Sequence, residues 1–203
     1  MPDLQAEFGP IDIYLFDQLL RGRIAPGMRV LDAGCGSGRN LVYLLRAGYE
    51  VCASDPDARA VEQVRQLAQA LAPGLPAAHF RVEPIERSTF DPASFDVVLA
   101  SAVLHFARDE AQFDAMMQGL WRVLRPGGLL FCRLASSIGM EDRVRLLGGR
   151  RFLLPDGSER YLVDEPLLLD LTRRLGGTLI DPLKTTVVQD QRCMTTWVVR
   201  KGP

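Results

Sequence analysis

Val30-Leu31-Asp32-Ala33-Gly34-Cys35-Gly36-Ser37-Gly38-Arg39-Asn40 is the stretch that decides the fold of this 203-residue chain. The apolar run that ends at Leu31 predicts a short buried strand, the glycines predict a turn, and residues 40–46 predict the opening of a helix. Gly34 and Gly36 have no Cβ, so the backbone there can approach a ligand closely. Unpaired N–H groups at the start of a helix attract an anionic group. The stretch therefore predicts a strand–turn–helix loop that holds a phosphate or a cofactor.

Two classes of ligand bind loops of this kind. The dinucleotide fingerprint is G-x-G-x-x-G, and its third glycine, counted from Gly34, falls on Arg39 in this chain. The additional glycine is Gly38, which makes the pattern Asp-x-Gly-x-Gly-x-Gly from Asp32 onward. This spacing, with an acidic residue ahead of the glycines, resembles the first motif of the class I methyltransferases that use S-adenosylmethionine. A purely structural glycine turn is the alternative for the loop taken alone.

A second acidic residue supports a nucleoside ligand. Residues 49–53 predict another short strand, which ends in Ser54-Asp55-Pro56. Asp55 lies about twenty residues beyond the glycines, where doubly wound nucleoside sites place a carboxylate that accepts hydrogen bonds from ribose hydroxyls. Asp55 can also cap the helix that follows, as can Asp57, and the two roles are compatible.

Strand-like and helix-like runs alternate along the chain. Strands are expected at 29–33, 50–54, 79–82, 95–101, 128–134, 178–183 and 194–200, and helices at 39–47, 58–70, 109–124 and 165–175. The alternation predicts an α/β fold with a doubly wound, mostly parallel sheet of seven strands. A short polar turn at 189–192 leaves no room for a crossover helix, so the last two strands should form a C-terminal antiparallel hairpin.

Motifs further along the chain strengthen the resemblance. Residues 94–98 (Ser-Phe-Asp-Val-Val) look like the family's fourth-strand motif, and residues 121–128 look like its junction between a helix and the fifth strand. The resemblance implies a Rossmann-like methyltransferase fold with S-adenosyl-L-methionine as cofactor. Within the family, the spelling of the glycine loop is similar to that of tellurite-resistance and thiopurine methyltransferases, which act on small soft nucleophiles.

The resemblance also implies a cofactor site. The residues expected to bind the cofactor are Asp32, Ala33, Gly34, Cys35, Gly36, Arg39, Asp55, Pro56, Ile85, Glu86 and Ser101. The helix start at Arg39 is expected to help hold the methionine carboxylate. The family usually has an aspartate after its third strand that receives the adenine amino group, but this chain has Glu83-Pro84-Ile85-Glu86 there. Either glutamate can substitute, with Ile85 packed on the adenine face.

Fewer sequence patterns point to the residues that would bind the methyl acceptor. His105 follows the fourth strand, close to where the methyl group should point, and is the candidate catalytic residue. It can act as a general base or position the acceptor, and simple packing against the cofactor is the alternative. Tyr14, Arg133 and Arg192 are candidate substrate-binding residues. An arginine in a buried strand needs an anionic partner, which is either a structural acid or the substrate.

The chain is expected to form a single domain over residues 1–203, since its length suits one core. Residues 1–27 are expected to form an N-terminal helical cap, and residues 137–164 a substrate-side insertion. The insertion contains four arginines, at positions 143, 145, 150 and 151. They indicate either a basic lid that recruits an anionic substrate or a solvated charged loop.

Composition argues against several partners. The net charge is −1 and the isoelectric point is near 6.1, so no basic face for nucleic acid is predicted. The apolar runs are too short to span a bilayer, and the N-terminus shows no signal-peptide pattern. Four scattered cysteines fit a cytoplasmic protein with reduced thiols. With two histidines and no cluster of carboxylates, no metal site is expected.

The predicted function is transfer of a methyl group from S-adenosylmethionine to a small-molecule acceptor, with a soft or anionic nucleophile as one candidate. After the fourth strand the chain lacks the Asn/Asp-Pro-Pro-aromatic sequence of enzymes that methylate exocyclic amines. Two alternatives remain: a non-catalytic protein that binds S-adenosylmethionine, and an NAD-dependent oxidoreductase. Arg39 in the place of a third glycine disfavours the oxidoreductase. The sequence does not indicate the oligomeric state.

Overall fold

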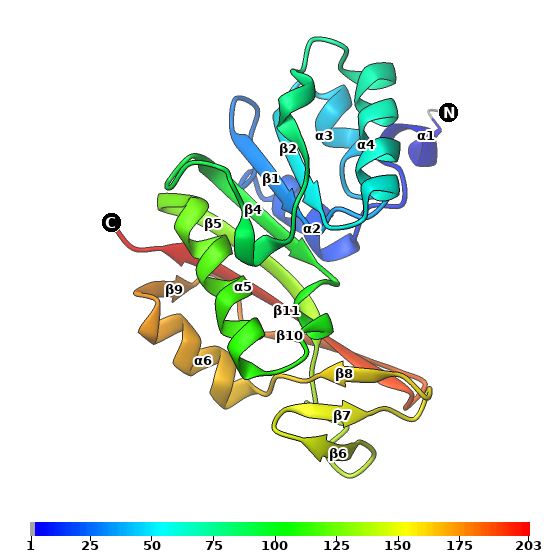
Figure 1. The fold of residues 1–203 in the computed structure, drawn as a ribbon, viewed down its shortest axis with the longest axis vertical. Helices are drawn as coiled ribbons and strands as arrows, with labels where there is room; N and C mark the ends of the chain where they lie inside the picture. The colour runs from blue at the N-terminus through cyan, green and yellow to red at the C-terminus, as the bar shows by residue number, and fades with distance from the viewer. Residues whose placement is uncertain (1–2) are drawn as a thin grey trace.

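The computed structural model describes residues 3–203 and places eight strands in one central sheet (Figure 1). The strands are β1 (Arg29–Ala33), β2 (Glu50–Asp55), β3 (Phe80–Val82), β4 (Phe95–Ser101), β5 (Leu124–Ala135), β9 (Gly177–Leu179), β10 (Lys184–Val188) and β11 (Arg192–Lys201). Their order is β10–β11–β5–β4–β1–β2–β3, and β9 pairs with β11 beside this path. β1 to β5 run parallel, whereas β11 is antiparallel to β5, β9 and β10. The predicted fold class, a mostly parallel sheet with an antiparallel end, is confirmed.

The strand expected at 178–183 is wrong in its bounds. The structure has two short strands there, because β9 ends at Leu179 and β10 begins at Lys184. Between them, Pro182 has no N–H for the strand ladder. Asp181 is buried and accepts hydrogen bonds from the side chains of Gln18 and Arg23. The edge strand is therefore split, which gives the main sheet eight strands where seven were expected.

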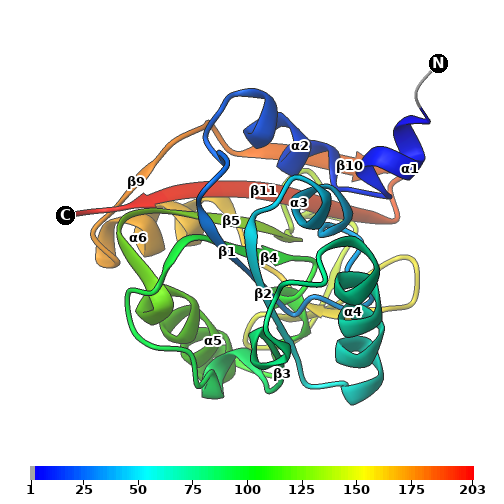
Figure 2. The same cartoon turned by 90° about the horizontal axis from the view of Figure 1, so that it is seen from above.

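Helices flank both sides of the sheet (Figure 2). They are α1 (Leu4–Phe8), α2 (Ile13–Leu20), α3 (Val42–Arg46), α4 (Ala58–Leu71), α5 (Glu110–Val123) and α6 (Glu165–Arg174). α4, α5 and α6 each begin after an aspartate whose side chain accepts a backbone N–H of the first turn, as helix caps do. The helix expected at 39–47 begins only at Val42. Gly38 has a φ of 81°, and the Leu41 N–H bonds its carbonyl in a turn, so residues 39–41 are not helical.

The two faces of the sheet are buried against different helices. Along β4, Val98 and Ala100 pack in the cluster that contains side chains of α5 and α6. The alternate residues, Val97 and Leu99, pack with side chains of α2, α3 and α4. This alternation is the period of a strand covered on both faces. A ligand can therefore reach the sheet only where its strands end.

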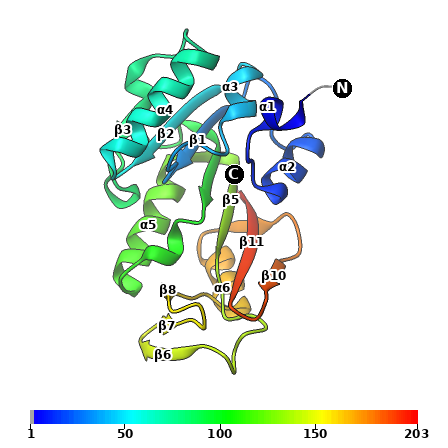
Figure 3. The same ribbon diagram turned by 90° about the vertical axis from the view of Figure 1, so that its right-hand side faces the viewer.

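The insertion expected at 137–164 contains a second, three-stranded antiparallel sheet that the sequence did not predict. It consists of β6 (Arg145–Gly148), β7 (Arg151–Leu153) and β8 (Glu159–Tyr161), and it projects from one end of the molecule (Figure 3). Tyr161 stacks on Phe113 of α5, with ring centroids 4.6 Å apart. The two ends of the insertion meet, because Ser136 and Val163 form an isolated β-bridge.

Three single-turn 3-10 helices lie next to strands in the chain. η1 (Ala77–His79) precedes β3, η2 (Ile85–Arg87) follows β3, and η3 (Leu104–Phe106) follows β4. η2 lies directly against α5, and Gly119 is one of the α5 residues at this contact. A Cβ built on Gly119 collides with the carbonyl oxygen of Ile85. Gly119 therefore sets how closely η2 approaches the helix.

We expect Gly119→Ala to destabilise the fold by about 1–3 kcal/mol, because overpacking against backbone outweighs the gain in helix propensity of about 1 kcal/mol. Urea unfolding measures the change. Gln118→Ala, at an exposed position of the same helix, is the matched control and should stay within about 0.5 kcal/mol of the parent. A Gly119→Ala protein as stable as the parent would show that η2 can move away freely.

Candidate functional site

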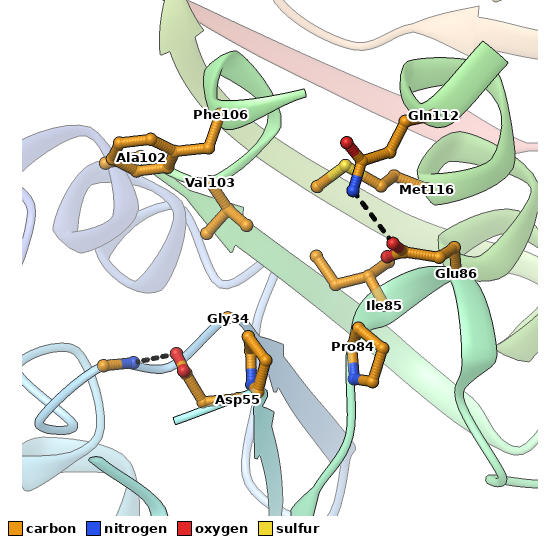
Figure 4. Close-up of a pocket in the computed structure, with 12 residues that line it drawn as sticks. Gly34, Asp55, Pro84, Ile85, Glu86, Ala102, Val103, Phe106, Gln112 and Met116 are labelled. Carbon is orange, nitrogen blue, oxygen red and sulfur yellow. Dashed lines mark hydrogen bonds between the residues drawn. The ribbon is translucent and has the colours of Figure 1, made fainter. Parts of the chain in front are cut away.

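Two neighbouring cavities open where β1, β2, β4 and β5 end. The first cavity measures about 500 Å³ and is lined by the glycine loop, Asp55–Pro56, η2, residues 102 and 103, Phe106 and one face of α5 (Figure 4). The second cavity measures about 370 Å³ and lies between η3, the end of β5, the β7–β8 hairpin and the β10–β11 turn. Ala102 and Phe106 line both cavities, so these two side chains form a shared wall.

The three glycines of the loop have different structural roles. All have positive φ, at 78° for Gly34, 51° for Gly36 and 81° for Gly38. A Cβ on Gly34 would lie 2.5 Å from Val103 Cγ2, and one on Gly38 would lie 3.0 Å from Val64 Cγ2 of α4. A Cβ on Gly36 would meet no atom within 4 Å. Gly34 and Gly38 thus allow packing, whereas Gly36 exposes bare backbone to the first cavity, as a closely approached ligand requires.

The carboxylate of Asp55 is held by backbone at the edge of the first cavity (Figure 4). Its Oδ2 accepts a hydrogen bond from the Gly36 N–H at 3.0 Å, and its Oδ1 accepts one from the Asp57 N–H at 2.9 Å. Each carboxylate oxygen has two lone pairs, so both can accept another bond. The cap of α4 is Asp57, which accepts the Arg59 N–H at 2.9 Å. Asp55 is therefore free to bind ligand hydroxyls.

Asp32 is a buried carboxylate without a complete set of partners. It is 1% exposed, and its Oδ2 has no hydrogen-bond partner among the described residues. Burial raises the pKa of Asp32 to about 7, and the charge of Asp55 adds to this rise while Arg39 opposes it. A positively charged ligand group at this point would restore the ionised form.

Arg39 acts through its side chain and not through a helix terminus. The expectation that a helix starts at Arg39 is wrong, because α3 begins at Val42. That Arg39 helps to hold a carboxylate stays a prediction. The guanidinium donates to Ser101 Oγ at 3.1 Å and lies 3.8 Å from Asp12 Oδ2. It also lines the second cavity. Arg39 and Ser101 thus lie at the junction of β1 and β4, beside Asp32.

The two glutamates after β3 have different surroundings. Glu83 is buried, and its carboxylate accepts bonds from Ser88 Oγ, the Thr89 N–H and Thr89 Oγ1, so its capacity is used within its own loop. Glu86 lines the first cavity and accepts a bond from Gln112 Nε2 at 3.0 Å (Figure 4). Of the two expected substitutes for an adenine-binding aspartate, only Glu86 lies at the cavity.

The structure brings together most, but not all, of the residues expected at the cofactor site. Six of them line the first cavity: Gly34, Gly36, Asp55, Pro56, Ile85 and Glu86. Asp32, Ala33, Cys35 and Ser101 are buried and line neither cavity, and Arg39 lines only the second. Burial raises the pKa of the Cys35 thiol, so it is not a nucleophile. Sequence reasoning missed Gln112 and Met116, which reach the cavity from α5.

His105 lines the second cavity with one ring nitrogen already used. The ring is 7% exposed, and its Nδ1 accepts a hydrogen bond from the Ala135 N–H at 3.2 Å. In the neutral ring the proton must then sit on Nε2, which becomes a donor. Burial, together with the charge of Arg160, lowers the pKa of His105 to about 4. This geometry disfavours the general-base role and favours a hydrogen bond from His105 to a bound acceptor.

Arginines dominate the second cavity. Its lining contains Arg39, Arg133, Arg160 and Arg192, with Asp156 as the single carboxylate. Two of the expected substrate residues, Arg133 and Arg192, are in this set, and Arg160 was missed. Tyr14 lines neither cavity; its hydroxyl bonds Thr186 Oγ1 at 2.7 Å, and Arg133 lies over its ring at 5.5 Å.

The four arginines considered as a lid do not reach either cavity. Arg143 pairs with Asp190, Arg150 with Asp164 and Arg151 with Glu159. Arg145 is exposed on β6. The structure therefore favours the solvated-loop alternative for these four residues.

A search of the described residues, 3–203, finds neither a helix long and apolar enough to cross a membrane nor a group of three or more potential metal-ligating side chains.

Comparison with known proteins agrees with this geometry. The family profile described as "Methyltransferase domain" matches residues 31–132. The chain is 41% identical over 185 residues to a ubiquinone biosynthesis O-methyltransferase of Methylocella silvestris, covering 82% of this chain and 68% of that protein. It is 30% identical over 115 residues to the tRNA 5-carboxymethoxyuridine methyltransferase of Escherichia coli, covering 56% of this chain but only 42% of that protein.

Among solved structures, one similar fold is the 1,6-didemethyltoxoflavin-N1-methyltransferase of Burkholderia thailandensis, solved with 1,6-didemethyltoxoflavin and S-adenosylhomocysteine bound. The TM-score is 0.71 at 21% identity, and the match covers 99% of this chain and 82% of that one. At this identity the likeness establishes the fold.

The pKa of His105 yields a stability prediction. Because the folded protein binds this proton less readily than the unfolded chain, stability falls as the pH drops below about 6.5 toward 4. Between about pH 7.5 and about pH 5, this one group should cost about 2 kcal/mol of unfolding free energy. Between the same two pH values, the unfolding free energy of His105→Gln should decrease by about 2 kcal/mol less than that of the parent protein, as measured by urea unfolding. Equal losses in both proteins would show that His105 does not carry the depressed pKa.

Proposed function

This chain belongs to the family of S-adenosylmethionine-dependent methyltransferases, and we propose that it transfers the methyl group to a small-molecule acceptor in the second cavity. The observation that carries the proposal is the pair of cavities that adjoin at Ala102 and Phe106, which line both. One cavity offers groups suited to a nucleoside, and the other offers a separate, charged compartment. Methyl transfer needs the donor and the acceptor in direct contact, so we place their meeting point beside Ala102 and Phe106, where the two cavities adjoin.

The residues present fit the cofactor. We assign the ribose hydroxyls to Asp55, whose oxygens keep free lone pairs, and the adenine to Ile85 and Glu86 at the far side of the first cavity. The amino-acid end is assigned to Asp32 and Arg39, which offer opposite charges at the β1–β4 junction. When bound, S-adenosylmethionine supplies an electrophilic methyl group on its sulfonium.

The protein's own contribution is then placement and exclusion of water. Ala102 has a φ of 64°, unusual for a residue other than glycine, and its N–H donates to the Arg133 carbonyl at 2.7 Å. This bond fixes the chain where β4 turns into η3, between the two cavities. Unfavourable backbone conformations such as the positive φ of Ala102 are common at functional sites, where surrounding contacts stabilise them.

The size of the second cavity favours a small acceptor. About 370 Å³ is within the usual range for small-molecule sites. The relatives' names point to different acceptors, ubiquinone precursors in one case and tRNA in another. A tRNA acceptor is therefore the second candidate, and a chain of net charge −1 disfavours it. We also propose a cytoplasmic location.

Incubation with labelled S-adenosylmethionine and a size-fractionated bacterial extract discriminates between these acceptors. We expect label to enter compounds that pass a small-pore membrane. Label retained with RNA or protein would overturn the small-molecule proposal. Binding of S-adenosylhomocysteine without labelled product from any fraction would favour a non-catalytic role.

Asp55→Ala and Asp57→Ala are a matched pair of variants that tests the assignment of the cofactor site through the affinity for S-adenosylhomocysteine. Loss of the Asp55 carboxylate should weaken S-adenosylhomocysteine binding about tenfold to 100-fold, since each charge-assisted hydrogen bond contributes about 1.5–3 kcal/mol. Asp57→Ala removes only the cap of α4 and should cost about 1 kcal/mol of stability while leaving that affinity unchanged.

Cofactor binding should also depend on pH through Asp32. In the free protein its pKa is about 7, and an ammonium group beside it would lower that pKa, so binding releases a proton. Affinity for S-adenosylhomocysteine should therefore fall as the pH decreases below about 7, by up to about tenfold per pH unit. Calorimetry on Asp32→Asn should give weaker binding at high pH and a flat profile. The same slope in both proteins would exclude Asp32 as its source.

A further inference from the structure

We propose that the acceptor is a carboxylate, and that Arg160 and Arg192 hold its anionic group in the second cavity. This inference rests on the proposed function and narrows the class of acceptor. It follows from the charge of the cavity, from the pairing of each arginine, and from the donor that His105 presents.

The second cavity carries an excess of positive charge that the chain as a whole does not have. Four arginines and one aspartate line it, whereas the net charge of the chain is −1. Asp12, which pairs with Arg133, offsets one further charge. Of the two positive charges that remain, one is that of Arg39, which is assigned to the cofactor. The other is left to the pair Arg160 and Arg192 after Asp156 is counted, with Arg160 half-buried and Arg192 exposed.

The four arginines differ in what already binds them. Arg133 donates to Asp12 Oδ2 at 3.0 Å, and Arg39 donates to Ser101 and lies 3.8 Å from the same aspartate. These two are engaged in the wall of the cavity.

Arg160 and Arg192 are the available pair. Across residues 3–203, Arg160 makes one hydrogen bond, from Nη1 to the Glu159 carbonyl oxygen at 2.7 Å, and no ion pair. Over the same residues Arg192 makes neither a side-chain hydrogen bond nor an ion pair. A guanidinium has five N–H donors, so both retain most of their capacity to bind a carboxylate.

Arg160 is also held close to the place where the two cavities adjoin. Its guanidinium lies over the ring of Phe106, 4.9 Å from the ring centroid, and Phe106 belongs to the wall shared with the first cavity. A carboxylate bound to Arg160 would therefore lie close to the side from which the methyl group is donated.

The remaining polar groups of the cavity suit an ionised acceptor. His105 has its Nδ1 occupied by the Ala135 N–H and can only donate from Nε2. The pKa of Asp156 is lowered, first by the hydrogen bond from Ser158 and also by Arg160 and Arg192, so it is a weak base. A carboxylate oxygen is the nucleophile in its anionic form, so no proton has to be removed. The methyl carbon would pass from the sulfonium sulfur to that oxygen, giving a methyl ester and S-adenosylhomocysteine, and His105 would donate a hydrogen bond to the carboxylate.

The test compares carboxylates with their uncharged amides on the protein saturated with S-adenosylhomocysteine. The probes are benzoate and benzamide, salicylate and salicylamide, and mercaptoacetate and mercaptoacetamide, measured by calorimetry. We expect at least one carboxylate to bind about tenfold or more tightly than its amide, a difference typical of a charge-assisted contact. Arg160→Gln and Arg192→Gln should each weaken that binding about tenfold.

Arg151→Gln is the matched control, because Arg151 is in the same small sheet, pairs with Glu159 and lines neither cavity. It should leave carboxylate binding unchanged. All three variants should keep the parent affinity for S-adenosylhomocysteine, which shows that they are folded.

Three outcomes would overturn the inference: equal binding of acids and amides, equal loss in Arg151→Gln, or no carboxylate binding at about 10 mM in a protein that binds S-adenosylhomocysteine. Each leaves methyl transfer as the function. Failure of the parent protein to bind S-adenosylhomocysteine is the separate result that would contradict the proposed function itself.

Discussion

The central sheet is covered by helices on both faces, so its polar groups can meet a ligand only where the parallel strands end. Val97 and Leu99 of β4 face one set of helices, while Val98 and Ala100 face the other, which leaves this central strand no solvent-facing side; the edge strand β10, in contrast, exposes Val187 and Val188. Polar residues with open cavities beside them, such as Asp55 at the end of β2, are found at the carboxyl ends, as in other open α/β sheets. Both cavities, and every group assigned to them, depend on this constraint.

Burial at this edge acts in opposite directions on two titratable groups. It raises the pKa of Asp32 to about 7 and lowers that of His105 to about 4, in each case by disfavouring the charged form. The two groups nevertheless differ in what they can bind, because their hydrogen-bond partners differ. Asp32 lacks a partner at one oxygen and is prepared for a cationic group, whereas His105 has a backbone donor and remains neutral.

How far the sequence predicts this site depends on how local each feature is. The glycine loop and Asp55 are contained in two strand–turn–helix units, so their patterns were readable along the chain. The start of α3 was misplaced because helical patterning does not register the positive φ of Gly38. Arg160 and Gln112 were missed for another reason. They reach the cavities only because the insertion folds back over η3 and α5 passes beside η2, and neither approach has a sequence period.

The insertion between β5 and α6 leaves and rejoins the sheet at one place, since Ser136 and Val163 are bridged. A segment with adjacent ends can change length at little cost in loop-closure entropy. It supplies Arg160 to the acceptor side and no residue to the first cavity. On the proposed assignment of the two cavities, acceptor preference can therefore diverge by exchange of one contiguous segment while cofactor recognition stays constant. The same boundary, residues 136 and 163, is the natural junction for grafting insertions between relatives to engineer new acceptor ranges.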